Sequence, residues 1–334
     1  KSNSKHSSEL IKNSTLKTHN STTHVVGILP MVHMKHFIFG NSLISIPFFD
    51  MAGILTDSIE AEEALLIKAI EIGKQLKVDN IELRQTDYLN SLNTTSDKFL
   101  IKNSEFKIQN CAIENRTNKV RMLLKIPNSS EELMKSFRAK LRSQIKKPMK
   151  EGLKVQIGDI ELLDDFYRVF TSNMRDLGSP VHSKRIIENV INGFYDITKI
   201  VIVYNQNEPV ACSIVVGFGK ILENPWASAL RQYSRLSPNM LLYWTMLEYA
   251  CDNGFEFFDF GRSTPNEGTY KFKEQWGAKP NPIFWQYIYL NEQNRSKEAK
   301  DDKSKYSKAI QYWQKLPVSV TIIIGPMIRK HIGL

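Results

Sequence analysis

One order of expected elements occurs twice along this chain: two strands, a loop, a long helix and a returning strand. In the first half these strands, helix and strand are expected at residues 25–29, 42–46, 60–76 and 81–83. In the second half they are expected at residues 210–218, 226–230, 237–253 and 255–260. Because recurrence of a whole supersecondary unit is typical of duplication, the sequence predicts two similar α/β domains with mixed sheets.

Composition divides the rest of the chain. Residues 1–24 are mostly small polar residues, Lys and His, which bury too little apolar surface to order, so we expect a disordered tail. The N-terminal domain is expected at 25–140 and the C-terminal domain at 141–290. A charged linker is expected at 291–308, and an amphipathic, apolar segment at 309–334 should dock on the protein body or on a membrane surface.

Charge points to an anionic partner. The chain carries a net charge of +10, and residues 131–154 hold eight basic side chains against three acidic ones. Such a run is either a solvated helix face or a site for a nucleotide, tRNA, anionic lipid or cell-wall precursor, with Arg142 and Lys146 as candidate ligands. We expect this basic helix to lie against the cleft between the two domains.

Other features narrow the class of protein. No apolar run reaches the roughly 18 residues that a membrane-spanning helix needs. Three scattered cysteines suit a reducing compartment, and the seven histidines have no metal-site spacing, so we expect a cytoplasmic protein without a metal. A Walker loop, a G-x-G-x-x-G turn and a nucleophile elbow are all absent from the sequence.

The loop at residues 231–239 joins an expected strand to the start of an expected helix. A helix N-terminus offers free backbone N–H groups and the positive end of the helix dipole, which together bind phosphate or carboxylate. Arg231 and Arg235 strengthen this interpretation, with Ser237 and Asn239 as further candidate ligands. Ordinary helix capping by Ser237, followed by Pro238, explains the same residues.

The strand at residues 255–260 carries Asp259 among four phenylalanines and ends in Gly261, Arg262 and Ser263. Open α/β sheets place ligands at the carboxyl ends of their strands, so Asp259 is either a general base or the structural anchor of Arg262. The following segment presents the other candidates: Tyr270 as proton donor, and Arg262, Ser263, Lys271 and Lys273 as substrate ligands. His182, in a loop between helices, is either a catalytic or an N-capping histidine.

The second half contains the run FDFGRSTPNEGTYKFKEQWGAKP at residues 258–280. This run resembles the signature of the FemAB-like acyltransferases of the GNAT superfamily, in particular the subgroup associated with exosortase and PEP-CTERM systems. Further similar pieces are VVGILPMVHMKHFIFGNSLISIPFFDMAGIL from Val25, LRSQIKKPMKEGL from Leu141, DLGSPVHS from Asp176 and LPVSVTIIIGP near the end, so the likeness covers residues 25–326. The resemblance implies two tandem GNAT-like domains.

The resemblance also implies a reaction, the transfer of an acyl or aminoacyl group to an amine. It implies acyl-CoA or aminoacyl-tRNA as co-substrate, although the glycine-rich pyrophosphate loop of ordinary acetyltransferases and the coiled-coil insertion of tRNA-using members are both missing here. We therefore expect a bacterial, cytoplasmic N-acyltransferase, peripheral to the inner membrane, that acts on a cell-envelope, peptidoglycan or exopolysaccharide precursor, with no DNA partner. The alternative is a non-catalytic GNAT-fold module that binds anionic lipid, polysaccharide or RNA.

Overall fold

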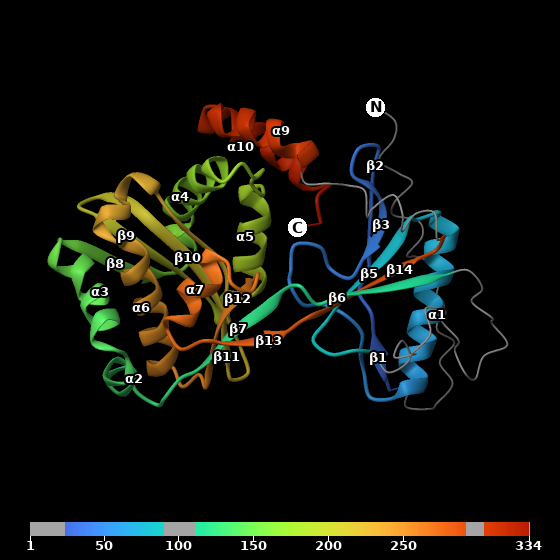
Figure 1. The fold of residues 1–334 in the computed structure, drawn as a ribbon, viewed down its shortest axis with the longest axis horizontal. Coiled ribbons are helices and arrows are strands. Elements are labelled where there is room, and N and C mark those ends of the chain that lie inside the picture. Colours follow the sequence, from blue (N-terminus) through green and yellow to red (C-terminus); the bar gives the residue numbers. More distant parts are fainter. Residues whose placement is uncertain (1–23, 90–110, 292–303, 334) are drawn as a thin grey trace.

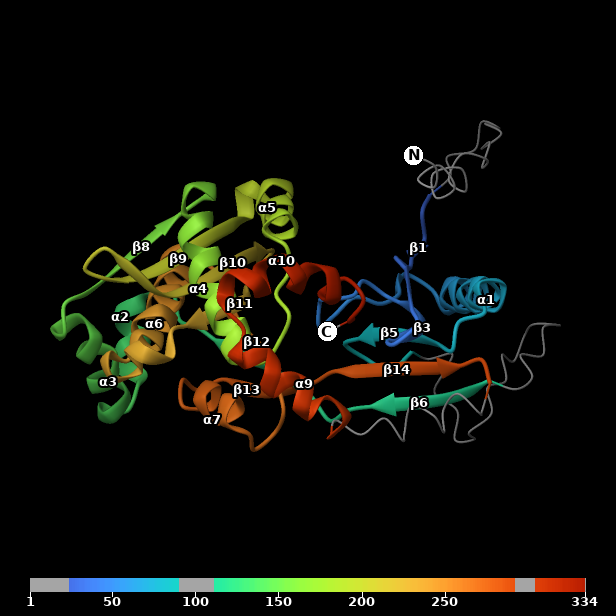
Figure 2. The same cartoon turned by 90° about the horizontal axis from the view of Figure 1, so that it is seen from above.

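The computed structural model describes residues 24–89, 111–291 and 304–333. The tail predicted at residues 1–24 and most of the predicted linker at 291–308 lie outside these ranges. The described residues form a seven-stranded and a five-stranded sheet that lie beside one another, each with helices packed on it (Figures 1 and 2). The predicted α/β class with mixed sheets is confirmed, because each sheet has one parallel pair of strands among antiparallel ones.

The seven-stranded sheet belongs mainly to the second half of the chain. In spatial order its strands are β13 (Lys279–Pro282), β7 (Val120–Lys125), β12 (Phe257–Ser263), β11 (Ile221–Ala229), β10 (Glu208–Phe218), β9 (Thr198–Asn205) and β8 (Leu153–Gly158). One face is covered by α2 (Ser130–Ser136), α3 (Ala139–Lys150), α6 (Pro238–Asp252) and α7 (Gly268–Glu274). The other is covered by α4 (Leu163–Asp176) and α5 (Lys184–Gly193), with the short turns η2 (Ile160–Leu162) and η3 (Tyr195–Ile197) at their ends.

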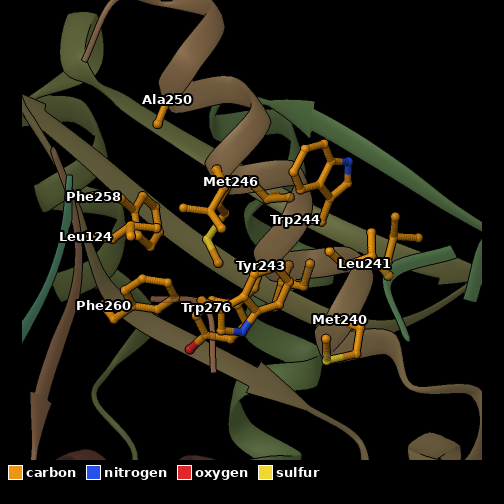
Figure 3. Packing of buried hydrophobic residues seen from close by; sticks show 14 of the residues in the cluster. Leu124, Met240, Leu241, Tyr243, Trp244, Met246, Ala250, Phe258, Phe260 and Trp276 are labelled. Carbon is orange, nitrogen blue, oxygen red and sulfur yellow. The ribbon is translucent and has the colours of Figure 1, made fainter. Parts of the chain in front are cut away.

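Strand alternation explains how one sheet supports two cores. In β9, Val201 and Val203 pack toward α6, whereas Ile200 and Ile202 pack toward α4. Helix α6 is apolar on nearly all sides because it is buried between the sheet and α3, and Tyr243 stacks on Phe260 with ring centroids 5.6 Å apart (Figure 3). The buried stripe of this helix thus fixes the position of the strand that carries Asp259.

The five-stranded sheet belongs mainly to the first half. Its order is β2 (Val32–His36), β3 (Gly40–Ile44), β5 (Asn80–Gln85), β14 (Phe284–Tyr289) and β6 (Ala112–Arg116). Helix α1 (Ile59–Leu76) packs on it through a core that includes Leu66 and Ile70, and Ser58 caps this helix by accepting a hydrogen bond from the backbone N–H of Ala61. The predicted helix at residues 60–76 is confirmed.

Each half contributes one strand to the sheet of the other half. Strand β6 lies in the five-stranded sheet, but β7, which follows almost at once, pairs with β12 and β13 in the seven-stranded sheet. In the same way β13 is followed by β14, which pairs with β5 and β6. The two crossings lie side by side between the sheets (Figure 1). The sheets therefore divide the chain between β6 and β7, not at the predicted boundary of residue 140.

The predicted repeat appears in the order of the strands. A hairpin, a helix and a parallel strand occur as β2, β3, α1 and β5, and again as β10, β11, α6 and β12. One detail of the prediction is wrong. The strand expected at residues 25–29 is only β1 (Gly27–Ile28), which pairs with β4 (Leu55–Thr56) in a separate ribbon, and β2 takes its place in the repeat.

Two further expectations differ from the structure. The strand expected at residues 226–230 is β11, which begins earlier, at Ile221, and includes Asn224 and Pro225, because a bulge opposite Ile214 and Val216 accommodates them. Ser237 does precede α6, but its backbone is left-handed with φ 59° and its side chain makes no capping hydrogen bond.

The chain ends in two helices, α9 (Ser304–Lys315) and α10 (Val318–Arg329), which pack on α4. Residues 304–308, expected in the linker, are therefore part of α9. Across residues 24–89, 111–291 and 304–333, no helix combines the length and the apolar character that crossing a bilayer requires.

Candidate active site at the junction of the two sheets

The junction between the sheets begins where β11 and β12 part. Their parallel pairing ends at Glu223 opposite Asp259. On its other side β12 has a bulge between Asp259 and Arg262, made possible by Gly261 with φ 75°. This irregularity places the signature residues beside the crossing strands and the loop that contains Asp50.

Asp259 is fully buried and is paired with a residue that the sequence analysis did not identify. Its carboxylate forms an ion pair with Arg121 of β7 and accepts a hydrogen bond of 2.8 Å from the backbone N–H of Gly261. Burial raises the pKa of this carboxyl, and the nearby Arg121 opposes the rise. The expectation that Asp259 anchors Arg262 is wrong, since its ionic partner is Arg121.

Arg262 instead reaches across to the first half of the chain. Its Nε lies 3.3 Å from Oδ1 of Asp50, and its backbone N–H donates to Oδ2 of the same residue. Its guanidinium lies 4.8 Å from the ring of Trp285, and the guanidinium of the buried Arg84 lies 4.5 Å from that ring. The indole N–H of Trp285 donates to the backbone oxygen of Asp50 over 3.0 Å, so these residues tie the two sheets together.

Lys273 of α7 is the buried cation of the junction. Its Nζ donates to the backbone oxygens of Gly261 (3.1 Å) and Arg262 (2.9 Å), which uses two of its three N–H donors. Burial lowers the pKa of Lys273 to about 8, although Asp259 and Asp50 nearby favour its charged form. A lysine with this pKa exchanges a proton near neutral pH.

Glu223 is the second group whose pKa lies near neutral pH. Burial, and next the charge of Asp259, raise its pKa to about 7, with Arg121 acting in the opposite direction. A small enclosed space in the junction is lined by Asp50, Arg121, Glu223, Asp259 and Arg262, among others. The site therefore combines a cation and an acid that both titrate between pH 6 and 9.

The basic helix does not lie at this junction. Helix α3 packs on α6 and β8, on the far side of the seven-stranded sheet from β14 (Figure 1), which contradicts the expectation that it lines the cleft. Arg142 donates to the backbone oxygen of Phe137, and Lys146 is exposed. Apolar packing of α3 on α6, through Leu141 and Ile145, determines this position.

The predicted anion site at the start of α6 forms a second, separate group. Arg231 and Arg235 lie exposed in the 3-10 turn η4 (Arg231–Leu236), and Asn239 is exposed in the first turn of α6. Lys147 of α3 joins them, because its Nζ donates to the backbone oxygen of Arg235 over 2.7 Å. Exposed cations therefore surround the N-terminus of α6.

The remaining candidates are dispersed. Ser263 is buried at the end of β12, and Tyr270 packs against the core beneath α7. Lys271 lines a groove of about 1040 Å³ that has α7 on one side and α2 with α3 on the other. His182 is buried beneath α10, where its Nε2 accepts a hydrogen bond of 3.2 Å from Nε of Arg329, and burial lowers its pKa to about 4. Of the predicted residues, the structure brings Asp259, Arg262 and Lys273 together.

Four further residues complete the site and were not predicted from the sequence: Asp50, Arg121, Glu223 and Trp285. Asp50 and Arg121 lie far from the signature along the chain, Glu223 precedes it by 35 positions and Trp285 follows it by five, and none of the four belongs to the signature run. Charged residues in short apolar strands, such as Arg121 in VRMLLK, are a usable signal, because a charge in a buried strand needs a partner.

Comparison with known proteins gives the family of the second half. Residues 135–274 match the family model of the acetyltransferase (GNAT) domain. No curated protein sequence matches the chain significantly.

Solved structures resemble nearly the whole chain. FemX is 16% identical with a TM-score of 0.57, over 83% of this chain and 88% of its own. The C-terminal domain of a putative lysylphosphatidylglycerol synthetase from Agrobacterium fabrum is 11% identical with a TM-score of 0.57, over 83% and 84%. L-PGS from Bacillus licheniformis is 9% identical with a TM-score of 0.54, over 92% and 87%. These likenesses show a shared fold, and the FemAB-like assignment and its exosortase-associated subgroup stay predictions.

Proposed function

We propose that this chain, which has a GNAT domain match at residues 135–274 and a FemX-like fold, transfers an acyl or aminoacyl group to the amine of an anionic cell-envelope, peptidoglycan or exopolysaccharide precursor. The observation that carries this proposal is the buried Lys273, with its lowered pKa, beside Asp259 and Arg262 at the point where β11 and β12 part. The name of one neighbour, a putative lysylphosphatidylglycerol synthetase, also describes an aminoacylated anionic lipid.

The chemistry needs a positive charge at the reacting carbonyl. The amine nitrogen forms a bond to this carbon, the bond to the thioester sulfur or ester oxygen breaks, and the proton lost by the amine passes to the leaving group. We assign the third N–H of Lys273 to the oxyanion that develops between these events. Tyr270, nearly one turn earlier in α7, is the candidate proton donor to the leaving group.

Asp259 and the arginines hold this arrangement. With both Arg121 and the Gly261 N–H on its carboxylate, Asp259 acts as a positioning residue. It shapes the bulge whose two carbonyl oxygens accept hydrogen bonds from Lys273. Arg262 and Arg84 supply positive charge for the anionic acceptor. Arg231, Arg235 and Lys147 at the start of α6 are the proposed ligands for the phosphates of the donor, which is acyl-CoA or aminoacyl-tRNA.

Direct assay tests this function. Purified protein is incubated with acetyl-CoA, longer acyl-CoA or aminoacyl-tRNA together with amine-bearing envelope precursors, and the product is measured by mass spectrometry. Lys273→Met should abolish transfer, whereas Lys199→Met, which removes a lysine of β9 paired with Asp159, should leave it unchanged. Full activity of Lys273→Met would contradict the mechanism, and polyanion binding without transfer by any donor would favour the binding module instead.

A further inference from the structure

Helix α10 is half buried and half exposed. Its inner face packs on the protein through Thr321 and through Gly325, which lies directly against Val181. Its outer face presents Ile323 and Met327, whose exposed fractions are 69% and 63%. The helix therefore docks on the body as expected, yet it leaves an apolar stripe in water.

A second exposed apolar group adjoins this helix. The turn between β2 and β3 presents Phe37, which is 91% exposed, and Ile38. The ring of His36 in this hairpin lies 4.3 Å from the ring of His331, just beyond α10. Both groups lie along the upper side of the molecule in Figure 1. We call the outer face of α10 together with the β2–β3 turn the apical surface.

Charge indicates what covers the apical surface. Residues 304–334 contain no Asp or Glu but five basic residues, and residues 31–49 also contain no acid. Lys35 and Lys330 are both exposed beside the apolar groups. Exposed apolar side chains flanked by cations suit the interface of an anionic bilayer, whereas a second copy of this chain would bring like charges together.

We propose that the apical surface binds an anionic lipid bilayer, with Ile323, Met327, Phe37 and Ile38 inserted among the acyl chains and the surrounding lysines on the lipid phosphates. The chain end links this surface to the junction, because the backbone oxygen of Gly333 accepts hydrogen bonds from the N–H of Phe48 and from Nη2 of Arg84. An acceptor held in the bilayer would thus be delivered close to Arg84 and Trp285. That delivery rests on the proposed function, whereas lipid binding does not.

Vesicle flotation of the full chain tests the proposal. We expect binding to vesicles of phosphatidylcholine with phosphatidylglycerol to exceed binding to phosphatidylcholine alone by about tenfold or more at low salt. Ile323→Glu with Met327→Glu, and separately Phe37→Ser with Ile38→Ser, should each reduce binding to the anionic vesicles by about tenfold. Phe218→Ser is the matched control, since Phe218 is 84% exposed in the β10–β11 turn and should bind as the unchanged protein does.

Circular dichroism and thermal melting of each variant show whether it is folded. Absence of binding to anionic vesicles, or equal binding by the folded apical variants, would overturn the proposal. So would a dimer in sedimentation experiments that both apical variants disrupt, because the surface would then bind a second copy. Transfer to a water-soluble acceptor, measured in parallel, separates loss of lipid binding from loss of the proposed activity.

Discussion

Lys273 shows how burial sets the chemistry of a single residue at the junction. Burial disfavours its ammonium form, while two backbone oxygens and the nearby carboxylates of Asp259 and Asp50 favour that form. The resulting pKa of about 8 leaves the ammonium present at neutral pH and removable just above it.

The pH dependence of the reaction follows from the assigned role of Lys273. Because the protonated form stabilises the oxyanion, kcat/KM should fall as pH rises through about 8. Lys273→Arg keeps a positive charge at all accessible pH values, so this decline should disappear even if the overall rate is lower. If the pH profile were identical in the unchanged protein and in Lys273→Arg, ionisation of Lys273 would not be the cause of the decline in kcat/KM.

Asp259→Asn separates positioning from base catalysis. The change leaves Arg121, whose side chain is only 19% exposed, without a charged partner, so the protein should lose roughly 3 kcal/mol of stability, and Arg121→Gln should cost a similar amount. Turnover per folded molecule should survive in both. Melting temperature and turnover are the two measurements, and a stable Asp259→Asn protein with turnover reduced about 100-fold would instead identify a general base.

Glu223 makes the stability of the protein depend on pH. Its folded pKa, about 7, lies above its ordinary value of 4.5, so its contribution to stability is complete below pH 4.5 and is lost as pH rises through 7. Glu223→Gln removes this loss and should raise stability at pH 8 by on the order of 1 to 3 kcal/mol, with little change at pH 4.5. Thermal unfolding of both proteins at pH 4.5 and pH 8 tests this prediction. If Glu223→Gln changed stability equally at the two pH values, the ionisation of Glu223 would not be the cause.

At the scale of elements, close backbone contact decides where α10 lies. Gly325 has no side chain, and an added Cβ would lie 3.1 Å from both Cγ1 and the backbone nitrogen of Val181. The nitrogen belongs to the backbone beneath the helix and cannot rotate away, so a side chain here would force the helix or this backbone to shift by a few tenths of an ångström. The same packing holds Arg329 against His182.

Gly325→Val should lift α10 from the body. We expect a loss of about 1 to 3 kcal/mol and faster protease cleavage within residues 304–333, since the helix is terminal. Gly193→Ala is the control, because the Cβ added there meets no atom within 4 Å. If limited proteolysis cleaves the Gly325→Val protein no faster than the Gly193→Ala protein, the contact with Val181 does not hold the helix.

At the scale of the whole molecule, exchange of β7 and β14 joins the sheets. Strand β14 forms ladders with both β5 and β6 in the first-half sheet, while β7 lies between β12 and β13. Neither sheet can be complete without a strand from the other half. The ion pair between Arg262 and Asp50 adds a side-chain link at the same place.

Unfolding should therefore be a single cooperative transition for the described body of the protein. Calorimetric and van't Hoff enthalpies should agree, and Tyr287→Pro, which breaks the centre of β14, should lower the stability of both halves together. Hydrogen exchange in α1 and α6 after this change provides the measurement for each half. Two separated transitions, with α6 unaffected by Tyr287→Pro, would show that the halves fold independently.

Local pattern in the sequence determined the elements and their order. Apolar spacing located α1 and α6, and the signature run identified Asp259, Arg262 and Lys273, because helical periodicity and a short motif are both contained within a few consecutive residues. The duplicated order also followed from these elements alone. The sequence thus determined the α/β class and the GNAT domain that the family model matches at residues 135–274.

Tertiary structure alone decided the partners of these residues. Asp259 pairs with Arg121 and Arg262 with Asp50, residues 138 and 212 positions away, because two strands cross between the sheets. Periodicity reports which face of a strand is buried, but not which sheet the strand joins, so the crossing and the domain boundary could not be predicted. The position of the basic helix was predicted wrongly for the same reason. Its charges were evident from the sequence, but the apolar contacts of Leu141 and Ile145 with the α6 side of the sheet determine where it lies.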